Sequence, residues 1–438
     1  MKIASQAGRS RRSRRPLLLL VLAALVAGIG SGRGAHAAPH AQRPGYVFYE
    51  DQREGFPKIA AYRPGCHFAP STLARFDWVV TSGTCTAFLD RVHARNRSLL
   101  GMIQPARPGQ LFAASYGGYD RVLSPLRHPA IGPIRGFRSG DWLHNTDGST
   151  HRMGTVNVLN LLSTDTALWS ADVAAYWARR NGALSRKHPG VMGVWGDNDF
   201  WSHQAYAFIG TPLDPKAVGA ATASANQAVW DQNFIARHNR LARDLPGMVI
   251  GGNDISSYSA DPAAYKGTVA KGWLLPGISS AGMRECADRY LGLYKASGVD
   301  RLITAAQRFL AGKRLDGKQR YVMLNNCNAT STQINEYSLA VATIGGFYYW
   351  PYTQSGWWGS TTTIAPTIPD YTRHGARHWL GFPTAAPQKL ASGLWKRTFQ
   401  HGVVYANMTG ATQTVDGRTL EDKTGLFTGN PPGHGAPK

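Results

Sequence analysis

The sequence has few cysteines and few acidic residues, and it lacks the short motifs that define several large enzyme classes. It contains no G-x-S-x-G elbow, no P-loop and no dinucleotide-binding glycine motif. These absences argue against α/β-hydrolases, nucleotide-hydrolysing enzymes and NAD-dependent enzymes. No dense run of Lys or Arg follows residue 40, and no zinc-finger spacing occurs, so we expect no nucleic-acid partner. We also expect no cofactor and no bound metal.

The four cysteines do not have the spacing of a metal site. An even number in an exported chain indicates two disulfides, which four cysteines can form in three ways. The sequence leaves all three pairings open, and we favour the two local ones, Cys66–Cys85 and Cys286–Cys327. The second bridge would hold the loop that carries Glu285 in a fixed place.

The one long apolar run lies near the N-terminus. Four arginines between positions 11 and 15 precede an apolar run at 17–29, and the small-residue site at 35–37 suits cleavage. This order is typical of a signal peptide over 1–37, so we expect secretion and no membrane span after cleavage. An uncleaved membrane anchor is the alternative.

The charge is strongly unbalanced towards the basic residues. Of 48 basic and 26 acidic residues, seven basic ones leave with the signal peptide, and the rest carry a net charge of +15. Such a surface favours acidic partners, among them cell-wall polymers and acidic polysaccharides. The alternative is that the excess of Arg is only compositional.

Short apolar runs alternate with helical patterns along most of the chain. Apolar stripes at helical spacing predict helices over 168–187, 226–243 and 331–345, with Arg237 interrupting the second stripe. This alternation predicts an α/β fold, a (β/α)8 TIM-like barrel over 43–383. Nine candidate strands compete for eight places, and the first and last are the doubtful ones: 45–49, 77–81, 99–103, 155–161, 191–196, 247–251, 272–276, 321–325 and 346–350.

The pattern changes after residue 383. Period-two alternation and turn residues predict a small antiparallel β-domain over 386–427, followed by a disordered tail over 428–438. If the turn spans Gln400 to Gly402, four apolar residues share the face that packs on the barrel, with an exposed sugar-binding Trp395 as the alternative. These four residues are Trp395, Phe399, Val403 and Tyr405.

Polar side chains follow several predicted strands. The segment 190–203 runs from an apolar strand directly into Asp197, and Asp254 and Glu285 come after later strands. Since catalytic groups of barrels lie at the carboxyl ends of the strands, these three are the candidate catalytic residues. Structural alternatives are a helix cap or a cation ligand for Asp197, a turn for Asp254 and an exposed helix face for Glu285.

Amides and aromatic rings near the same strand ends suit sugar binding, because planar groups bond hydroxyls and rings stack on a pyranose. His374 and His378 are four residues apart, as in a metal site on a helix, but no third ligand is evident. The candidate substrate-binding residues are Asp199, Asn198, Trp195, Trp201, Asn253, Asn325 and Trp350.

Three segments resemble the family described as hypothetical glycosyl hydrolases, number fifteen. They are GVWGDN, SLAVATIGGFYYW, and LGFP followed by GLWKRTFQHGVVYANMTGATQTV, within a resemblance that covers roughly 45–420. The first is similar to a DGVFLDN-type strand end, with Met192 in place of the acidic residue and Asp197 as the matching carboxylate. The resemblance implies a secreted glycosidase barrel that ends in a small β-domain.

The leading hypothesis is a secreted glycoside hydrolase that cleaves sugar bonds with two carboxyl groups. Asp197 would be the nucleophile or base and Glu285 the acid, with Asp254 second for that role and Asp199 tuning its neighbour. The alternative is a non-catalytic carbohydrate- or cell-wall-binding protein on the same scaffold. A weaker third hypothesis, suggested by charge alone, is a phosphodiester hydrolase.

Overall fold

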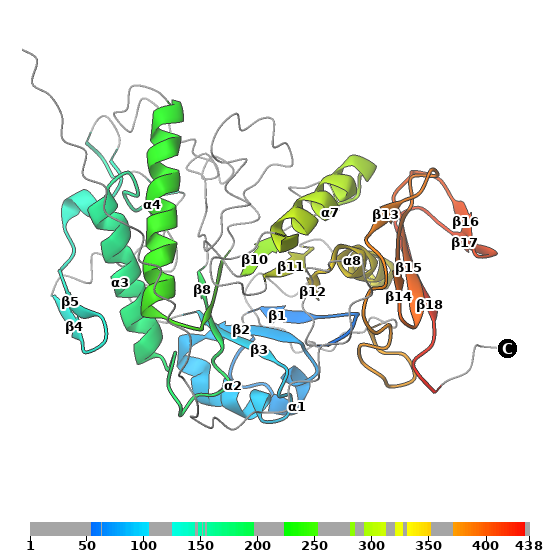
Figure 1. Ribbon diagram of the computed structural model, residues 1–438, viewed down its shortest axis with the longest axis horizontal. Coiled ribbons are helices and arrows are strands. Elements are labelled where there is room, and N and C mark those ends of the chain that lie inside the picture. Colours follow the sequence, from blue (N-terminus) through cyan, green and yellow to red (C-terminus); the bar gives the residue numbers. More distant parts are fainter. Residues whose placement is uncertain are drawn as a thin grey trace, which may run out of the picture. The chain divides into compact units, whose positions relative to one another are not determined.

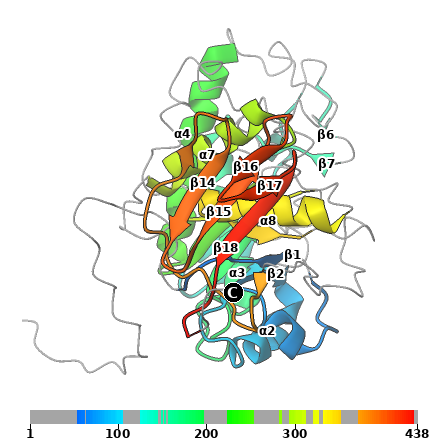
Figure 2. The same ribbon diagram turned by 90° about the vertical axis from the view of Figure 1, so that its right-hand side faces the viewer.

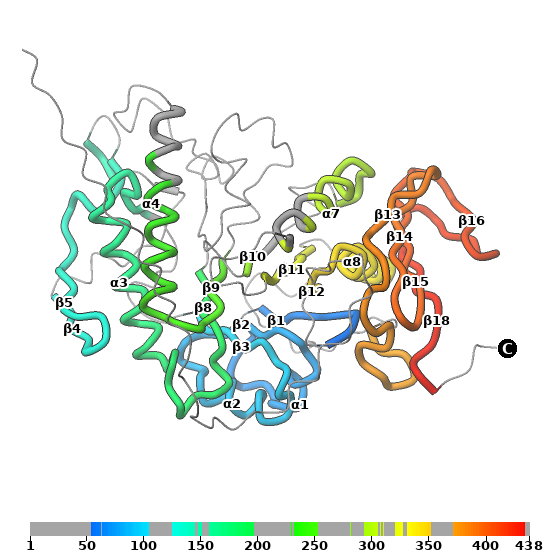
Figure 3. The backbone as a smooth tube through the Cα atoms, viewed as in Figure 1, coloured from blue at the N-terminus to red at the C-terminus, as the bar shows by residue number. Residues whose placement is uncertain are grey.

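We describe the protein from a computed structural model. The chain divides into two units, 1–40 and 41–438, and every described residue belongs to the second (Figure 3). The described residues are 54–62, 64–104, 125–144, 148–150, 152–153, 156–196, 223–252, 281–284, 293–311, 320–326, 331–351 and 371–433.

The central element is a sheet of eight strands, in which every pair of neighbours is parallel (Figure 1). The strands follow one another in chain order, as expected when helical crossovers connect neighbours in one direction. They are β1 (Ala60–Tyr62), β2 (Trp78–Ser82), β3 (Leu100–Gln104), β8 (Gly193–Gly196), β9 (Val249–Gly252), β10 (Ala281–Arg284), β11 (Tyr321–Asn325) and β12 (Tyr348–Trp350).

The inner face of this sheet is filled by large aromatic side chains. The ring of Trp78 on β2 lies 5.6 Å from Trp195 on β8, 5.3 Å from Tyr348 and 6.4 Å from Tyr321. These contacts join strands that are not neighbours, so the sheet curves around the cluster. Alternate residues of the same strands, such as Val79, point the other way and pack with the helices.

The two outer strands of the sheet touch. Ile59, directly before β1, forms a parallel bridge with Tyr349 of β12, and the Tyr349 N–H donates to the Lys58 carbonyl at 2.9 Å. This link is a bridge and not a ladder. The structure therefore shows an α/β fold with an eight-stranded parallel sheet, and the closed barrel remains an interpretation of it.

Helices cover the outer face of the sheet. Ser163 and Ser331 cap the N-termini of α3 and α8, and Gly346, whose φ of 83° favours glycine, caps the C-terminus of α8. Within the described ranges, no helix has both the length and the apolar character needed to cross a membrane. The helices are α1 (Pro70–Leu73), α2 (Thr86–His93), α3 (Thr164–Arg180), α4 (Ala223–Asp244), α7 (Ala296–Ala311) and α8 (Thr332–Gly345), with 3₁₀ turns η1 (Gly83–Cys85) and η3 (Ser139–Asp141).

Helices α3 and α4 lie side by side (Figure 1). Arg237, which interrupts the apolar stripe of α4, is fully buried, and its Nε donates to the hydroxyl of Ser170 on α3 at 3.1 Å. The residue that weakened the sequence pattern is therefore part of the helix contact, because a buried polar partner compensates for its desolvation.

Three of the predicted strands need correction or lie outside the described residues. The doubtful strand 346–350 is real and becomes β12, whereas 155–161 gives only β7 (Val156–Asn157), which pairs with β6 (Arg152–Met153) away from the main sheet. Strands 45–49 and 272–276 lie outside the described residues. Two sheet positions belong to β1 and β10, which the pattern did not predict, and β4 (Leu126–His128) and β5 (Gly132–Ile134) form a further hairpin.

The C-terminal part forms antiparallel sheets beside α8 (Figure 2). Strand β18 extends beyond the predicted limit of 427, so the start of the predicted disordered tail is strand. The domain boundaries themselves stay predictions. The four-stranded sheet has the order β13 (Gln388–Lys389), β14 (Trp395–Phe399), β15 (Gly402–Asn407) and β18 (Thr424–Gly429), and β16 (Gln413–Val415) pairs with β17 (Arg418–Leu420).

The hairpin between β14 and β15 corrects the predicted face. Phe399 pairs directly with Gly402, so the turn has two residues instead of three, and all later side chains change face. Phe399 packs with Val404 in the main core, while Tyr405 packs with the β16–β17 hairpin. The Trp395 indole N–H donates to Asp300 of α7 at 2.8 Å, which favours a packing role over an exposed platform.

Strand β18 approaches α8 most closely at Gly425. A Cβ at this position would lie 2.6 Å from the Ala340 Cβ and 3.0 Å from the Glu336 carbonyl oxygen. We expect Gly425→Ala to lower the free energy of unfolding by about 1–3 kcal/mol, because sheet and helix must move apart. Urea unfolding followed by tryptophan fluorescence measures this. Gly140→Ala, where a Cβ meets nothing within 4 Å, is the control and should be neutral or slightly stabilising.

Candidate functional site

The carboxyl ends of the parallel strands meet at one edge of the sheet. Ladders at this edge pair Gly196 of β8 with Gly252 of β9, Arg284 of β10 with Leu324 of β11, and Asn325 with Trp350 of β12. The three strands β8, β9 and β10 therefore end directly before the polar segments that the sequence singled out. In particular, β10 ends directly before Glu285 in the sequence, and the sequence pattern did not predict this strand.

Most candidate residues lie just beyond these strand ends. Of the ten candidate catalytic and substrate-binding residues, the structure describes Trp195, Asn325 and Trp350. Seven candidates lie outside the described residues, as do two of the four cysteines: Asp197, Asn198, Asp199, Trp201, Asn253, Asp254, Glu285, Cys286 and Cys327.

Trp195 has a different position from the one expected of a sugar platform. Its side chain is fully buried, and its ring lies 5.9 Å from that of Tyr62 and 5.6 Å from that of Trp78. A ring without exposed surface cannot stack on a sugar, so this expectation is corrected. Trp195 instead forms part of the packed layer beneath the carboxyl edge.

Asn325 and Trp350 are the last residues of neighbouring strands. Their Cα atoms are paired in the β11–β12 ladder. Asn325 is fully buried, and Trp350 is half-buried with its ring 5.0 Å from that of Tyr62. Both stand on the inner-facing phase of their strands, since Met323 and Tyr348 belong to the inner cluster.

Two further residues lie at the same edge, and neither was a candidate in the sequence analysis. Tyr62 ends β1, and Gln104 ends β3 on the phase of Leu100 and Met102, with 5 % of its surface exposed. Gln104 directly follows the predicted strand 99–103, so its position as a polar strand end could have identified it. Tyr62 could not be found in this way, because the short strand AAY carries almost no pattern.

A disulfide joins two loops at this edge. Cys66 follows β1, Cys85 closes the η1 turn after β2, and the two are bonded with their Cα atoms 5.5 Å apart. The first predicted pair is thus present. It ties together the segments that leave two neighbouring strands, which restricts their motion at the carboxyl edge.

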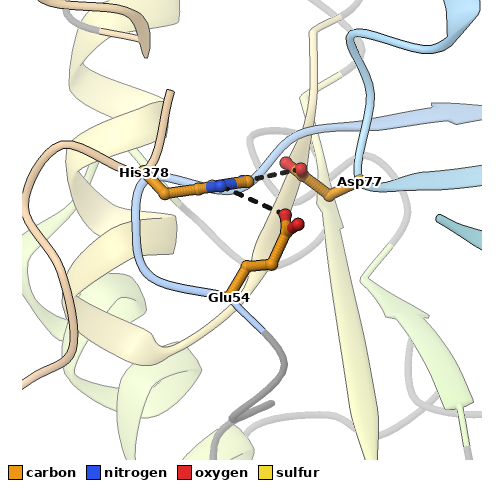
Figure 4. Close-up of side chains that lie close together, drawn as sticks. All are labelled: Glu54, Asp77 and His378. Carbon is orange, nitrogen blue, oxygen red and sulfur yellow. Dashed lines mark hydrogen bonds and ion pairs between the residues drawn. The ribbon is translucent and has the colours of Figure 1, made fainter. Parts of the chain in front are cut away.

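A second cluster of titratable groups lies at the opposite, amino end of the strands (Figure 4). Asp77 directly precedes β2, and its carboxylate accepts the Ile59 N–H at 2.7 Å and His378 Nε2 at 2.7 Å. The other ring nitrogen of His378 lies 3.1 Å from the Glu54 carboxylate. Arg377 forms ion pairs with both carboxylates.

This cluster resembles a metal site in composition only. One ligand atom from each of Glu54, Asp77 and His378 lies within 4.8 Å of the others. The two nitrogens of His378, however, face different carboxylates, and the Arg377 guanidinium already supplies the positive charge that a cation would bring. His374 and His378 are not on a helix, because the segment is a turn in which both residues have positive φ.

The electrostatics of this cluster are those of an ion-pair network. Burial alone would raise the pKa of Asp77, but the charge and hydrogen bond of His378, the charge of Arg377 and the Ile59 N–H together lower it. Groups at the amino end of parallel barrel strands typically serve stability. We therefore assign this cluster to holding the fold and the carboxyl edge to the candidate site.

No known protein family matches the sequence, and no curated protein sequence matches it. Among solved structures, the glycoside hydrolase domain of PelA from Pseudomonas aeruginosa and a point variant of that domain are similar, each with 12% identity and a TM-score of 0.34. The matches cover 68% of this chain and 96% and 95% of those chains. A TM-score this low carries neither fold family nor activity over to this chain. The resemblance to hypothetical glycosyl hydrolases of number fifteen stays a prediction.

Asp77→Asn tests the network at the amino end. Since the folded-state pKa of Asp77 is lowered, its carboxylate stabilises the fold fully above the unfolded pKa of about 4, and this contribution is lost as the pH falls through the folded value. We expect the variant to lose about 3 kcal/mol of unfolding free energy at neutral pH and to converge with the wild type in acid. Urea unfolding at several pH values measures both.

Asp165→Asn is the matched control for this prediction. Asp165 also pairs with an arginine, Arg135 at 2.7 Å, but its side chain is 65% exposed. Its loss should change the free energy by less than about 1 kcal/mol. An Asp77→Asn variant as stable as this control would contradict the assignment.

Proposed function

We propose that this chain is a secreted glycoside hydrolase on a TIM-like (β/α)8 barrel, with Asp197 as nucleophile or base and Glu285 as acid. The observation that carries the proposal is the alternation of side chains on β8 and β10. Trp195 and Ala281 belong to the inner cluster, so positions 197 and 285 fall on the inner-facing phase when the alternation continues. The same continuation from Ile250, which packs in the outer core, would put Asp254 on the opposite phase.

The ladders also support a workable separation of the two carboxyl groups. Gly196, Gly252 and Gly282 are successive partners across β8, β9 and β10. With strands about 4.8 Å apart, two strand spacings of about 10 Å separate Gly196 from Gly282. We propose that the carboxyl groups that follow these two strands approach to the separation of about 5–9.5 Å used by glycosidases.

The described residues around this edge suit a sugar. Gln104 ends β3, beside β8, and offers a planar amide that is 5 % exposed, and the half-buried Trp350 offers a ring at the end of β12. Asn325 is fully buried like Trp195, so we do not count it among the groups that contact the sugar. Amides bond hydroxyl groups and rings stack on the apolar face of a pyranose, so the substrate class we propose is an oligo- or polysaccharide.

Secretion is the setting we propose for this activity. The Cys66–Cys85 disulfide is the kind of bond that persists in oxidising compartments outside the cytosol. The strongly basic composition supports an acidic polysaccharide or cell-wall polymer as the substrate. The second proposed bridge, Cys286–Cys327, would tie the segment after β10 to the end of β11.

Paired variants test the catalytic assignment. We expect Asp197→Asn and Glu285→Gln each to lower kcat by at least about 100-fold while substrate still binds, because general acid–base groups contribute about 10²–10⁴-fold. Activity is measured as reducing ends released from the polysaccharide, within a panel of neutral and acidic ones, that the wild type cleaves fastest. Binding to the same polymer is measured by affinity electrophoresis, and folding by near-UV circular dichroism.

Asp254→Asn is the control, since it removes a carboxylate that the proposed alternation puts on the outer face of the sheet. It should keep activity within a few-fold of the wild type. Loss of activity in this variant equal to that of Asp197→Asn would contradict the proposed phase. If the wild type binds polysaccharides from the panel but cleaves none, a carbohydrate-binding protein without catalysis replaces the enzyme.

A further inference from the structure

The surface formed by α2 and two neighbouring segments carries many exposed basic side chains. Helices α1 and α2 lie side by side (Figure 1), and the turns that follow them are joined, because the Asn96 amide donates to the carbonyls of Ala74 at 3.2 Å and Phe76 at 2.9 Å. Every Arg and Lys side chain of three segments here is exposed, and we call these side chains together the basic surface. They are Arg75 in segment 70–77, Arg91, Arg95 and Arg97 in 86–98, and Arg186 and Lys187 in 185–190.

The third of these segments is held against α2 by the side chain of Asp90. One carboxylate oxygen of Asp90 lies 2.7 Å from Nδ1 of His188, and the other accepts the Gly190 N–H at 2.9 Å. Asp90 directly precedes Arg91, and His188 directly follows Lys187, so this contact brings basic side chains of the two segments close together. All three segments lead into strands of the parallel sheet, namely β2, β3 and β8, and therefore lie at its amino end.

No carboxylate neutralises the basic surface. Among the described residues, none of its six side chains takes part in an ion pair. The guanidinium groups of Arg91 and Arg95 donate to backbone carbonyls of α2 at 3.2 Å, which holds them along the helix and leaves their charge in place. The only acidic residues of the three segments are Asp90, which is bound as described, and Asp77, which pairs with Arg377.

The electrostatics at α2 agree with an unneutralised positive charge. The pKa of His93 is lowered, first by burial and next by the charge of Arg97, against the opposing charge of Asp90. A cationic imidazole is disfavoured where the surroundings are already positive. The same potential attracts anions, and at an exposed surface this attraction weakens as the ionic strength rises.

The spread of the six charges favours an extended anion over a compact one. Arg91 and Arg95 lie one helical turn apart, and the other four side chains come from separate turns and loops. A compact anion would reach one or two of them, whereas a polymer with a charge on each unit would contact several at once. The planar fork of arginine fits a carboxylate with two parallel hydrogen bonds.

The same surface suits a polysaccharide better than a single-stranded nucleic acid. Nucleic acids of this kind bind by stacking their bases on exposed aromatic rings. Among the described residues, the exposed large apolar side chains are Leu184 and Val229, and both are aliphatic. Leu184 lies two residues before Arg186, with a φ of 63° that leucine rarely adopts, and its side chain suits the apolar face of a sugar.

We propose that the basic surface binds an acidic polysaccharide whose sugars carry carboxylates. This surface lies at the amino end of the parallel sheet, whereas the proposed catalytic residues follow the carboxyl ends of the strands. The chain would thus hold a polymer at a place distinct from the one where it is proposed to cleave sugars.

Binding of the full chain to polygalacturonate, which carries one carboxylate on each sugar, tests this proposal. The matched polymer is the methyl ester of polygalacturonate, which keeps the backbone and removes the charge. We expect binding to polygalacturonate only, with an affinity that falls as the ionic strength rises to about 0.15 M, where charges are screened beyond about 8 Å. Biolayer interferometry on the immobilised polymers measures the dissociation constants.

Variants that remove charge locate the surface. The triple variant Arg91→Gln, Arg95→Gln and Arg97→Gln should bind polygalacturonate about tenfold more weakly and with less salt dependence, since each exposed ion pair changes an equilibrium by up to about fivefold. Arg186→Gln combined with Lys187→Gln, in a loop, should also weaken binding and serves if the helix variant does not fold. The control replaces by Gln three exposed arginines of separate elements and should bind within about twofold of the wild type: Arg127, Arg301 and Arg418.

Several outcomes would overturn the proposal. A wild type that does not bind polygalacturonate, or variants of the basic surface that bind it as the wild type does, would each contradict it. An equal loss in the control would show attraction by net charge alone. Single-stranded DNA bound more tightly than polygalacturonate at the same ionic strength would replace the polysaccharide by a nucleic acid. The measurement involves no turnover, so its result is independent of whether the proposed enzyme cleaves any sugar bond.

Discussion

The packing of large rings inside the curved parallel sheet is the constraint on which the rest of the structure depends. Trp78 touches side chains from three other strands, so strand spacing, curvature and side-chain phase must all agree around it. Interiors packed at this density tolerate little change in volume. The strands are buried on both faces. Helices pack against the outward-pointing residues, such as Val79 and Val194, and the inward-pointing residues form the aromatic cluster beneath the carboxyl edge.

Burial on both faces also explains how much of the fold could be predicted. Runs such as 321–325, which is apolar up to Asn325, were found, since a buried parallel strand reads as a short apolar run. Strand β1 has three residues and β10 begins with Ala and Gly, so neither has such a run. Arg237 made the pattern of α4 look weaker than the helix is. Hydrogen bonding allows this arginine to be buried where an apolar residue was expected.

The candidate site was predictable as an edge of the sheet but not as a set of roles. Polar residues directly after apolar strands pointed to it, and β8 and β10 end directly before positions 197 and 285. The side-chain alternation could not be followed without the true strand limits, and only the proposed continuation of the strands separates Asp254 from Asp197 and Glu285. Trp195 shows the same limit of the sequence pattern, because the pattern does not distinguish a ring buried beneath the carboxyl edge from one exposed at it. The hairpin at Phe399 shows that one turn residue reverses a whole face.

In the proposed enzyme, the two ends of the parallel strands would carry different tasks. At the amino end, the Arg377 guanidinium and the His378 ring contact the Asp77 carboxylate, and these contacts hold Asp77 and the segment 371–381 in place. A carboxylate paired in this way has a lowered pKa and is a poor proton donor near neutrality. Acid catalysis needs the reverse, a carboxyl group without a cationic partner and in apolar surroundings, which raise its pKa. The aromatic layer of Tyr62, Trp195 and Trp350 provides such surroundings at the carboxyl edge. Stability and chemistry can therefore be separated along the strand axis of one sheet.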